Sequence, residues 1–185
     1  MIDDHLLLAV LADSQRFGAL GESPQVALAH AERFLAALGA ASVVLDLGSG
    51  GGVPGLVLAV RRPDLSLVLL DRRTARTDLL RRLVLKLGVS ERVRVVSGDA
   101  LLVGRQPEFV GAFDTVVCRS FGSPEVTAAC ASPFLGDGGH LVVTEPPGTP
   151  PRWGCESIQK YGLSPVESPP GLQILQKLPK LRPDR

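Results

Sequence analysis

The chain has few cysteines, almost no net charge and no long hydrophobic run, and each shortage excludes a class of protein. Its three cysteines are far apart and form no CxxC pair, which argues against a zinc site or a disulfide framework and favours a reducing environment. A net charge of +1 gives no overall nucleic-acid signal, so RNA binding would have to depend on a local patch. The apolar run at residues 6–12 is too short to cross a membrane, and Asp3 and Asp4 stand where a secretion signal would be basic. We therefore expect a soluble, cytoplasmic protein that holds no metal.

The apolar residues, 45% of the chain, are arranged as short strands that alternate with helices. A chain of 185 residues suffices for one domain with a full core, which we expect over residues 1–185. Runs rich in Val and Leu predict strands covered on both faces at 43–47, 67–71, 93–97, 114–118 and 140–144. Helices are predicted at 54–61, at 74–87 and after Ser123-Pro124, and a strand pair at 162–166 and 172–177. This alternation predicts an α/β fold with a doubly wound, mostly parallel sheet over residues 43–178.

Three less regular segments complete the predicted fold. Residues 1–40 are expected to form a helical accessory segment, with one helix over 4–20 and a second from Ser23-Pro24 to about Leu38. Gly138-Gly139 predicts a turn before the fifth strand, and the prolines within 146–153 predict a loop.

The glycine-rich segment after the first strand marks the predicted ligand site. In a sheet of this kind the ligand lies beyond the carboxyl ends of the strands, beside strand one. Glycines at 48, 50 and 52 let the backbone turn sharply and approach a ligand, and a helix that opens at Pro54 directs free N–H groups toward an anionic group. We predict a cofactor site formed by Asp46, Gly48, Ser49, Gly50, Gly52, Pro54, Asp71, Arg72, Asp99, Ala100 and Arg119.

Acidic residues indicate which cofactor this site holds. Glycines 50, 52 and 55 also match the dinucleotide pattern GxGxxG, but Asp46 would lie poorly beside a pyrophosphate and suits the cationic amino group of a methionine-like ligand. Asp71 ends the second strand, where an acid accepts hydrogen bonds from ribose hydroxyls, and Asp99 follows the third, within reach of an adenine amino group. Each acid alone could be a turn or a helix cap. Three acids that end three consecutive strands favour S-adenosylmethionine over a nicotinamide cofactor.

Three segments of the chain resemble one protein family. Residues 45–60 read LDLGSGGGVPGLVLAV, residues 69–71 end the second strand in Leu-Leu-Asp, and residues 113–120 read FDTVVCRS. They resemble the bacterial 16S ribosomal RNA guanine-N7 methyltransferase family of the glucose-inhibited division protein B type. The Val-Pro-Gly at 53–55 is the most specific part. The match runs from about Val43 to Gly139, with weaker similarity at His30 and at residues 172–177.

The resemblance implies a Rossmann-like class I methyltransferase with a seven-stranded sheet whose last strand is antiparallel. It also implies S-adenosylmethionine as methyl donor and a guanine of small-subunit ribosomal RNA as acceptor. Arg119 falls on the arginine of the family's Ser-Arg-Ala motif, and the resemblance implies that it is the catalytic residue, which orients the base or a phosphate. The alternative for Arg119 is a salt bridge to Asp99 or Glu145.

The chain also departs from this family, which leaves other substrates open. Glu145-Pro146 stands where the family has Lys-Gly, and a glutamate there is expected to repel RNA. Asp99 replaces an arginine, and the basic pair after Asp71 is reduced to Arg76. A divergent paralogue that methylates a small molecule or a protein, or a cofactor-binding module without catalysis, remains an alternative. The sequence leaves the oligomeric state open.

Few residues suggest general-base or RNA-binding chemistry. The three histidines, at 5, 30 and 140, have no carboxylate at a useful spacing, and Cys118 is interpreted as a small buried strand residue. A guanine N7 carries an in-plane lone pair and requires no base. The candidates for an RNA face, otherwise a solvated helix surface, are Arg72, Arg73, Arg76, Arg81, Arg82, Lys86, Lys177, Lys180, Arg182 and Arg185.

Overall fold

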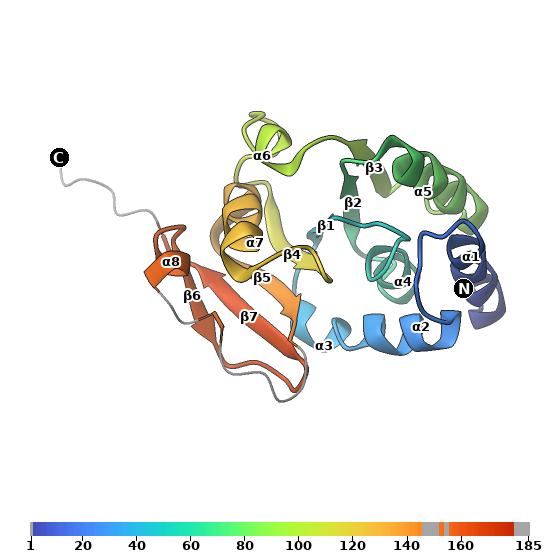
Figure 1. The fold of residues 1–185 in the computed structure, drawn as a ribbon, viewed down its shortest axis with the longest axis horizontal. Coiled ribbons are helices and arrows are strands. Elements are labelled where there is room, and N and C mark those ends of the chain that lie inside the picture. Colours follow the sequence, from blue (N-terminus) through green and yellow to red (C-terminus); the bar gives the residue numbers. More distant parts are fainter. Residues whose placement is uncertain (1, 146–151, 154–155, 180–185) are drawn as a thin grey trace.

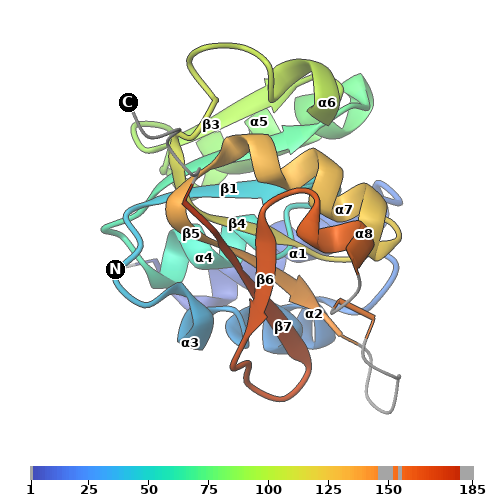
Figure 2. The ribbon, with the colours of Figure 1, turned by 90° about the vertical axis from the view of Figure 1, so that its left-hand side faces the viewer.

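The computed structural model describes residues 2–145, 152–153 and 156–179, which form a seven-stranded sheet in the order β3-β2-β1-β4-β5-β7-β6 (Figure 1). Its strands are β1 (Val43–Leu47), β2 (Ser66–Asp71), β3 (Val93–Ser97), β4 (Phe113–Cys118), β5 (Leu135–Thr144), β6 (Leu163–Val166) and β7 (Leu172–Lys177). Strands β1 to β5 run parallel, whereas β7 is antiparallel to both β5 and β6. The predicted sheet with an antiparallel last strand is confirmed, and Figure 2 looks onto its β6–β7 edge.

Helices cover both faces of this sheet. They are α1 (Asp4–Arg16), α2 (Pro24–Glu32), α3 (Leu35–Leu38), α4 (Gly55–Arg61), α5 (Thr74–Leu87), α6 (Ala100–Val103), α7 (Pro124–Ala131) and α8 (Glu156–Gln159). Val44 and Val117 pack with α4 and α5 on one face, whereas the next residue in β1, Leu45, packs with α7 on the other. This alternation follows from the two-residue repeat of a strand, and it explains why runs of consecutive apolar residues predicted strands buried on both faces. Figure 1 shows α6 and α7 on one side of the strands and α4 and α5 on the other.

The N-terminal helices pack outside α4 rather than standing apart from the core. Leu7 and Leu11 of α1 and Ala31 of α2 are fully buried together with Val57 of α4. Their predicted bounds were wrong. The first helix ends at Arg16, and the second is divided into α2 and α3 because Phe34 turns into the core and its N–H bonds to the Ala31 carbonyl, only three residues back.

The predicted turn at Gly138-Gly139 is wrong, because both glycines lie inside β5. The register between β4 and β5 shifts between Phe113 and Thr115, and Gly138 adopts a φ of +80° at this irregularity. A Cβ atom at Gly139 would lie 3.0 Å from the Asp114 carbonyl oxygen, so the glycine allows the neighbouring strand to approach closely. Helix α6 was not predicted, since four residues carry too little periodicity to recognise.

Two observations concern the limits of the described chain. No helix among the described residues is long and apolar enough to cross a membrane. Most of the predicted loop at 146–153 lies outside the described residues, which there include only Arg152 and Trp153.

Candidate functional site

A cavity of about 470 Å³ lies at the carboxyl ends of the first four strands. Gly48 after β1, Asp71 at the end of β2 and Ser120 after β4 contribute to its wall. Five residues predicted from the sequence line it: Gly48, Asp71, Arg72, Asp99 and Ala100. The parallel strands bring together residues that are far apart in the sequence, such as Gly48 and Ser120, as expected at the switch point of a doubly wound sheet.

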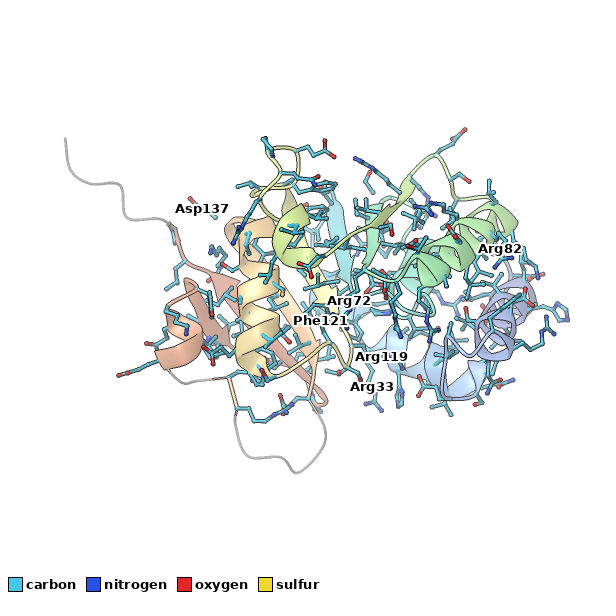
Figure 3. All side chains as sticks on the ribbon, turned by 45° about the horizontal axis from the view of Figure 1, so that its top comes forward. Arg33, Arg72, Arg82, Arg119, Phe121 and Asp137 are labelled. Carbon is cyan, nitrogen blue, oxygen red and sulfur yellow. The ribbon has the colours of Figure 1, made fainter. Side chains whose placement is uncertain are left out.

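Gly48 has a side chain pressed against it that sequence analysis did not single out. Gly48 has a φ of +74°, and a Cβ atom there would lie 2.6 Å from Cδ2 of Phe121. Phe121 lines the cavity together with Arg72, and both are labelled in Figure 3. An aromatic residue three positions after the fourth strand was the only local signal for this position, and it points to no particular role by itself.

Asp46 lies behind the cavity wall rather than on it. It is only 1% exposed, and its Oδ2 accepts a hydrogen bond from the Gly55 N–H at 3.0 Å. Its Oδ1 is buried without a hydrogen-bond partner among the described residues. Burial raises the pKa of Asp46 to about 7, although the Gly55 N–H, the Ser49 hydroxyl and the charge of Arg119 act in the opposite direction.

The remaining residues predicted from the glycine segment support the loop from within. Ser49, Gly52 and Pro54 are buried, and the peptide bond before Pro54 is cis. A Cβ atom at Gly52 would lie 2.4 Å from the Leu56 side chain, so this glycine allows α4 to pack beneath the loop. Gly50 is half-buried, and its N–H donates to Asp71.

The two acids that line the cavity also hold its walls in place. Oδ2 of Asp71 accepts from the Gly50 N–H and Oδ1 accepts from the Arg73 N–H, each at 2.9 Å, so this carboxylate ties the end of β2 to the loop after β1. Asp99 is exposed and caps α6 by accepting from the Leu101 N–H at 2.9 Å. The helix-cap alternative for Asp99 is therefore observed, and the residue lines the cavity at the same time.

Arg119 forms a contact that sequence analysis did not predict. Its Nη1 pairs with Oε1 of Glu22, in the segment between α1 and α2, so the predicted alternative of a bridge to Asp99 or Glu145 is wrong. Oε2 of the same glutamate lies 3.0 Å from Nδ1 of His30, and the view that His30 has no carboxylate partner is also wrong. The next residue, Ser120, adopts a φ of +53°, an uncommon conformation for a residue with a side chain. Arg119 is labelled in Figure 3.

A second cavity, of about 170 Å³, adjoins the ends of β4 and β5. Ser120 and Phe121 line both cavities, and Trp153 and Thr144 line only the smaller one. Cys118 forms part of its wall, is 2% exposed and has its thiol pKa raised by burial, as expected for a structural strand residue. Two adjoining spaces therefore lie at this edge of the sheet, with Ser120 and Phe121 in the wall of both. In the described part of the chain, Arg119 lies outside both linings.

Glu145 is held by two neighbours rather than facing open solvent. Its Oε1 accepts from Nε of Arg152 at 2.9 Å, its Oε2 accepts from the indole N–H of Trp153 at 2.5 Å, and its side chain is 17% exposed. Trp153 is 4% exposed and lines the smaller cavity. The charge that was expected to repel RNA is thus directed at a guanidinium.

Replacing Glu145 by lysine is expected to destabilise the protein by about 1–3 kcal/mol, because the indole N–H loses its acceptor and a second cation faces Arg152. Trp153 is the only tryptophan, so its fluorescence reports the change directly. We expect a red-shifted emission and a lower unfolding midpoint for Glu145→Lys, and neither for Glu125→Gln, which removes the exposed ion pair with Lys160. An unshifted emission of Glu145→Lys would contradict this role.

The basic residues predicted as an RNA face are largely engaged in contacts. On α5 these are Arg76 with the Gly18 carbonyl (2.7 Å), Arg81 with Asp78 (2.7 Å), Arg82 over the Phe17 ring (5.1 Å) and Lys86 with Asp13 (2.7 Å). Lys177 donates to the Tyr161 carbonyl at 2.8 Å. Arg72 and Arg73 are exposed at the larger cavity, and the predicted residues at 180, 182 and 185 lie outside the described chain.

Within the described residues, no group of three or more His, Cys, Asp or Glu could hold a metal ion.

Solved structures share this fold, and several of them are described as methyltransferases. A putative O-methyltransferase from Klebsiella pneumoniae superimposes with a TM-score of 0.66 at 16% identity, covering 96% of this chain and 91% of its own. The structure described as PigF with SAH superimposes with a TM-score of 0.65 at 18% identity, covering 91% of this chain and 58% of its own. At these identities the likeness shows the class I methyltransferase fold alone.

Sequence comparison identifies the family. Ribosomal RNA small subunit methyltransferase G of Deinococcus deserti is 34% identical over 152 residues, which are 78% of this chain and 62% of that protein. The protein of the same name from Moorella thermoacetica is 33% identical over 108 residues, 58% of this chain and 45% of its own length. The chain thus spans about half the length of the curated relatives it matches. A family profile matches residues 30–145, which contain β1 to β5 and most of the candidate site. The chain therefore belongs to the GidB family, described as rRNA small subunit methyltransferase G.

Proposed function

We propose that the chain binds S-adenosylmethionine in the larger cavity and transfers its methyl group to a base of small-subunit ribosomal RNA. Membership of the family supports both halves of this proposal. The single observation that carries the site is the cavity between Gly48, Asp71 and Asp99, at the end of the sheet where such folds bind their ligands. We further propose that segment 1–40 and the core at 43–178 act as one domain.

The residues present fit this cofactor. Asp71 and Asp99 supply carboxylate oxygens for ribose hydroxyls and an adenine amino group, and the Phe121 ring offers an apolar wall. The unpartnered Oδ1 of Asp46 is a buried acceptor near the loop, suited to a cationic amino group directly or through water. The SAH named in the PigF structure is the demethylated form of the same cofactor, which supports the choice. S-adenosylmethionine supplies an electrophilic methyl group on a sulfonium.

The chain's own residues would act by positioning. Displacement at a methyl group requires the acceptor atom in line with the leaving sulfur, so the walls of the two adjoining cavities can supply much of the acceleration. A guanine N7 needs no base, and the thiol of Cys118 is unsuited to being one, because burial raises its pKa. We assign to Arg119 the orientation of the base or of a phosphate, since Glu22 engages its Nη1 and, within the described residues, its other nitrogens have no hydrogen-bond partner.

The acceptor and its location follow from the same proposal. Arg72 and Arg73 are exposed at the mouth of the larger cavity, where a phosphate of the substrate could be met. An acceptor in the small ribosomal subunit would place the protein in the cytoplasm. A protein or small-molecule acceptor remains the competing possibility, and the experiments below distinguish it.

Calorimetry is expected to show binding of S-adenosylhomocysteine and none of NAD, because the Asp46 carboxyl beside the glycine loop suits a cationic amino group and not a pyrophosphate. Asp71→Asn tests whether the ligand binds in this cavity, because asparagine keeps the shape of the side chain and removes its charge. Heat with NAD alone would overturn the cofactor assignment.

Nucleoside mass spectrometry of ribosomal RNA tests the acceptor. RNA from cells that lack the gene is expected to miss one methylated guanosine, and the gene supplied again should restore it. Identical spectra in both strains, together with turnover of S-adenosylmethionine on another acceptor, would rule out the ribosomal assignment. Binding of the cofactor without turnover on any acceptor would identify a module without catalysis.

A further inference from the structure

Glu22 connects the N-terminal segment to the carboxyl end of β4. Its Oε1 binds Nη1 of Arg119, which is 97 positions away, and its Oε2 faces Nδ1 of His30 at 3.0 Å. The side chains of Arg119 and Glu22 are only 20% and 24% exposed, so water screens this pair less than an ordinary surface ion pair. One carboxylate therefore restrains an arginine at the proposed site and is itself restrained from the other side.

The backbone that carries Glu22 is fixed to the glycine loop. The Ser14 hydroxyl donates to the Gly51 carbonyl at 2.8 Å, and Arg76 donates to the Gly18 carbonyl at 2.7 Å. A Cβ atom at Gly51 would lie 2.7 Å from the Ala19 carbonyl oxygen, so the two backbones are in direct contact. The segment before α2 is thus held beside the loop, and this fixes the position of Glu22.

Arg119 needs such a restraint because a second carboxylate lies nearby. Burial raises the pKa of Asp46 overall, and the charge of Arg119 opposes this rise, so the two side chains are close enough to interact. Glu22 binds Arg119 from a different part of the chain, the segment just before α2. With one of its nitrogens bound to Glu22, the guanidinium keeps Nε and Nη2 for an acceptor group.

We propose that Glu22 is a positioning residue for Arg119 in methyl transfer, and that His30 holds the carboxylate of Glu22 in the orientation this requires. The inference rests on the proposed function, because Arg119 is taken to contact the acceptor. It assigns a role to the N-terminal segment that the sequence indicates only as an accessory element. Glu22 itself takes no part in the bonds made or broken.

The test uses Glu22→Gln, which keeps the size of the side chain and removes its charge. Its kcat for transfer to small subunits is expected to fall roughly tenfold, within the range measured for contacting pairs, while the Kd for S-adenosylhomocysteine stays unchanged. Glu32→Gln is the matched control: Glu32 ends α2, the helix that follows Glu22, and pairs with Arg61 at 2.7 Å outside the linings of both cavities, so the kcat of this variant should equal that of the wild type. His30→Gln should reproduce part of the loss.

A double-mutant cycle separates positioning from a structural role. If Glu22 acts through Arg119, adding Glu22→Gln to Arg119→Ala causes no further loss of kcat. Independent, multiplying losses would overturn the inference, as would a rise in kcat for Glu22→Gln, which would instead identify Glu22 as a competitor of the substrate. A parallel loss of cofactor affinity in Glu22→Gln would assign the residue to the loop and would equally overturn it.

Hydrogen exchange provides a measurement that does not require the acceptor. Glu22→Gln should accelerate amide exchange in residues 119–122, and Glu32→Gln should not. If the wild type methylates no RNA, the proposed function fails, and unchanged exchange in Glu22→Gln would still overturn the positioning role separately.

Discussion

Replacing Arg119 by alanine is expected to lower kcat for methyl transfer by about 100-fold and to leave the affinity for S-adenosylhomocysteine unchanged. The reason is the position of Arg119 in the fold. Arg119 follows β4, between two residues that line the smaller cavity, and lies outside the lining of the larger one within the described chain. An arginine held by one nitrogen can donate to an acceptor base from the others, and this contact is lost with the side chain.

Two further variants make this expectation specific. Arg119→Lys keeps the charge but cannot pair with Glu22 and still present two free donors in one plane, so only a small part of the activity should return. Arg94→Ala removes another arginine with a single carboxylate partner, Glu108, on an exposed part of β3, and should leave kcat unchanged. Equal losses of rate and of cofactor affinity in Arg119→Ala would place the arginine in the donor site or in the fold.

The parts of the fold that the sequence predicted well are those with local causes. The bounds of β1, β3 and α5 agree with the prediction because short Val/Leu runs and an amphipathic repeat are read within a few residues. Gly88 ends α5 with a φ of +68°, the conformation for which glycine is preferred there. The start of β5 was missed because it depends on register with β4, and the division after α2 was missed because Phe34 responds to a core formed by distant segments.

The residues of the site follow the same rule: those fixed by local structure were predicted, and those that depend on distant contacts were not. Asp71 and Asp99 line the cavity because strand ends are fixed by the sheet, and strand ends were predictable. Asp46 is the last residue but one of β1, yet it lies behind the wall, since its position depends on the contact with Gly55. The pair formed by Glu22 and Arg119 could not be predicted, because no pattern in the sequence around either residue indicates it. The two residues meet only when the N-terminal segment docks on the loop.

Replacing Asp46 by asparagine is expected to change how stability depends on pH. Burial raises the pKa of the folded carboxyl to about 7 from a value of 3.8, so the folded protein keeps this proton up to pH values at which the unfolded chain has lost it. The free energy of unfolding therefore falls as the pH rises from about 4 to 7 and is constant above, and the full change amounts to at most about 4 kcal/mol. Asparagine carries no such proton, so the difference in the free energy of unfolding between Asp46→Asn and the wild type should grow in favour of the variant over the same pH interval.

Unfolding in urea at several pH values between 4 and 8 measures this difference. Asp114→Asn is the matched control of opposite sign: backbone N–H groups of Ser42 and Val43 lower the pKa of Asp114, so its replacement should cost stability at neutral pH and progressively less as the pH falls through its folded pKa. Parallel pH curves for the wild type and Asp46→Asn would show that the carboxylate is not buried as described.

The same variant tests whether the charge of Asp46 serves the ligand. If a cationic amino group pairs with ionised Asp46, the affinity of the wild type for S-adenosylhomocysteine should rise with pH up to about 7, because binding requires loss of the proton. Asp46→Asn should bind more weakly at pH 8 and without this dependence, although it is the more stable protein there. A gain in stability combined with a loss of affinity would mean that the buried acid is retained for binding at the expense of the fold. Equal affinities at every pH would limit Asp46 to its contact with Gly55.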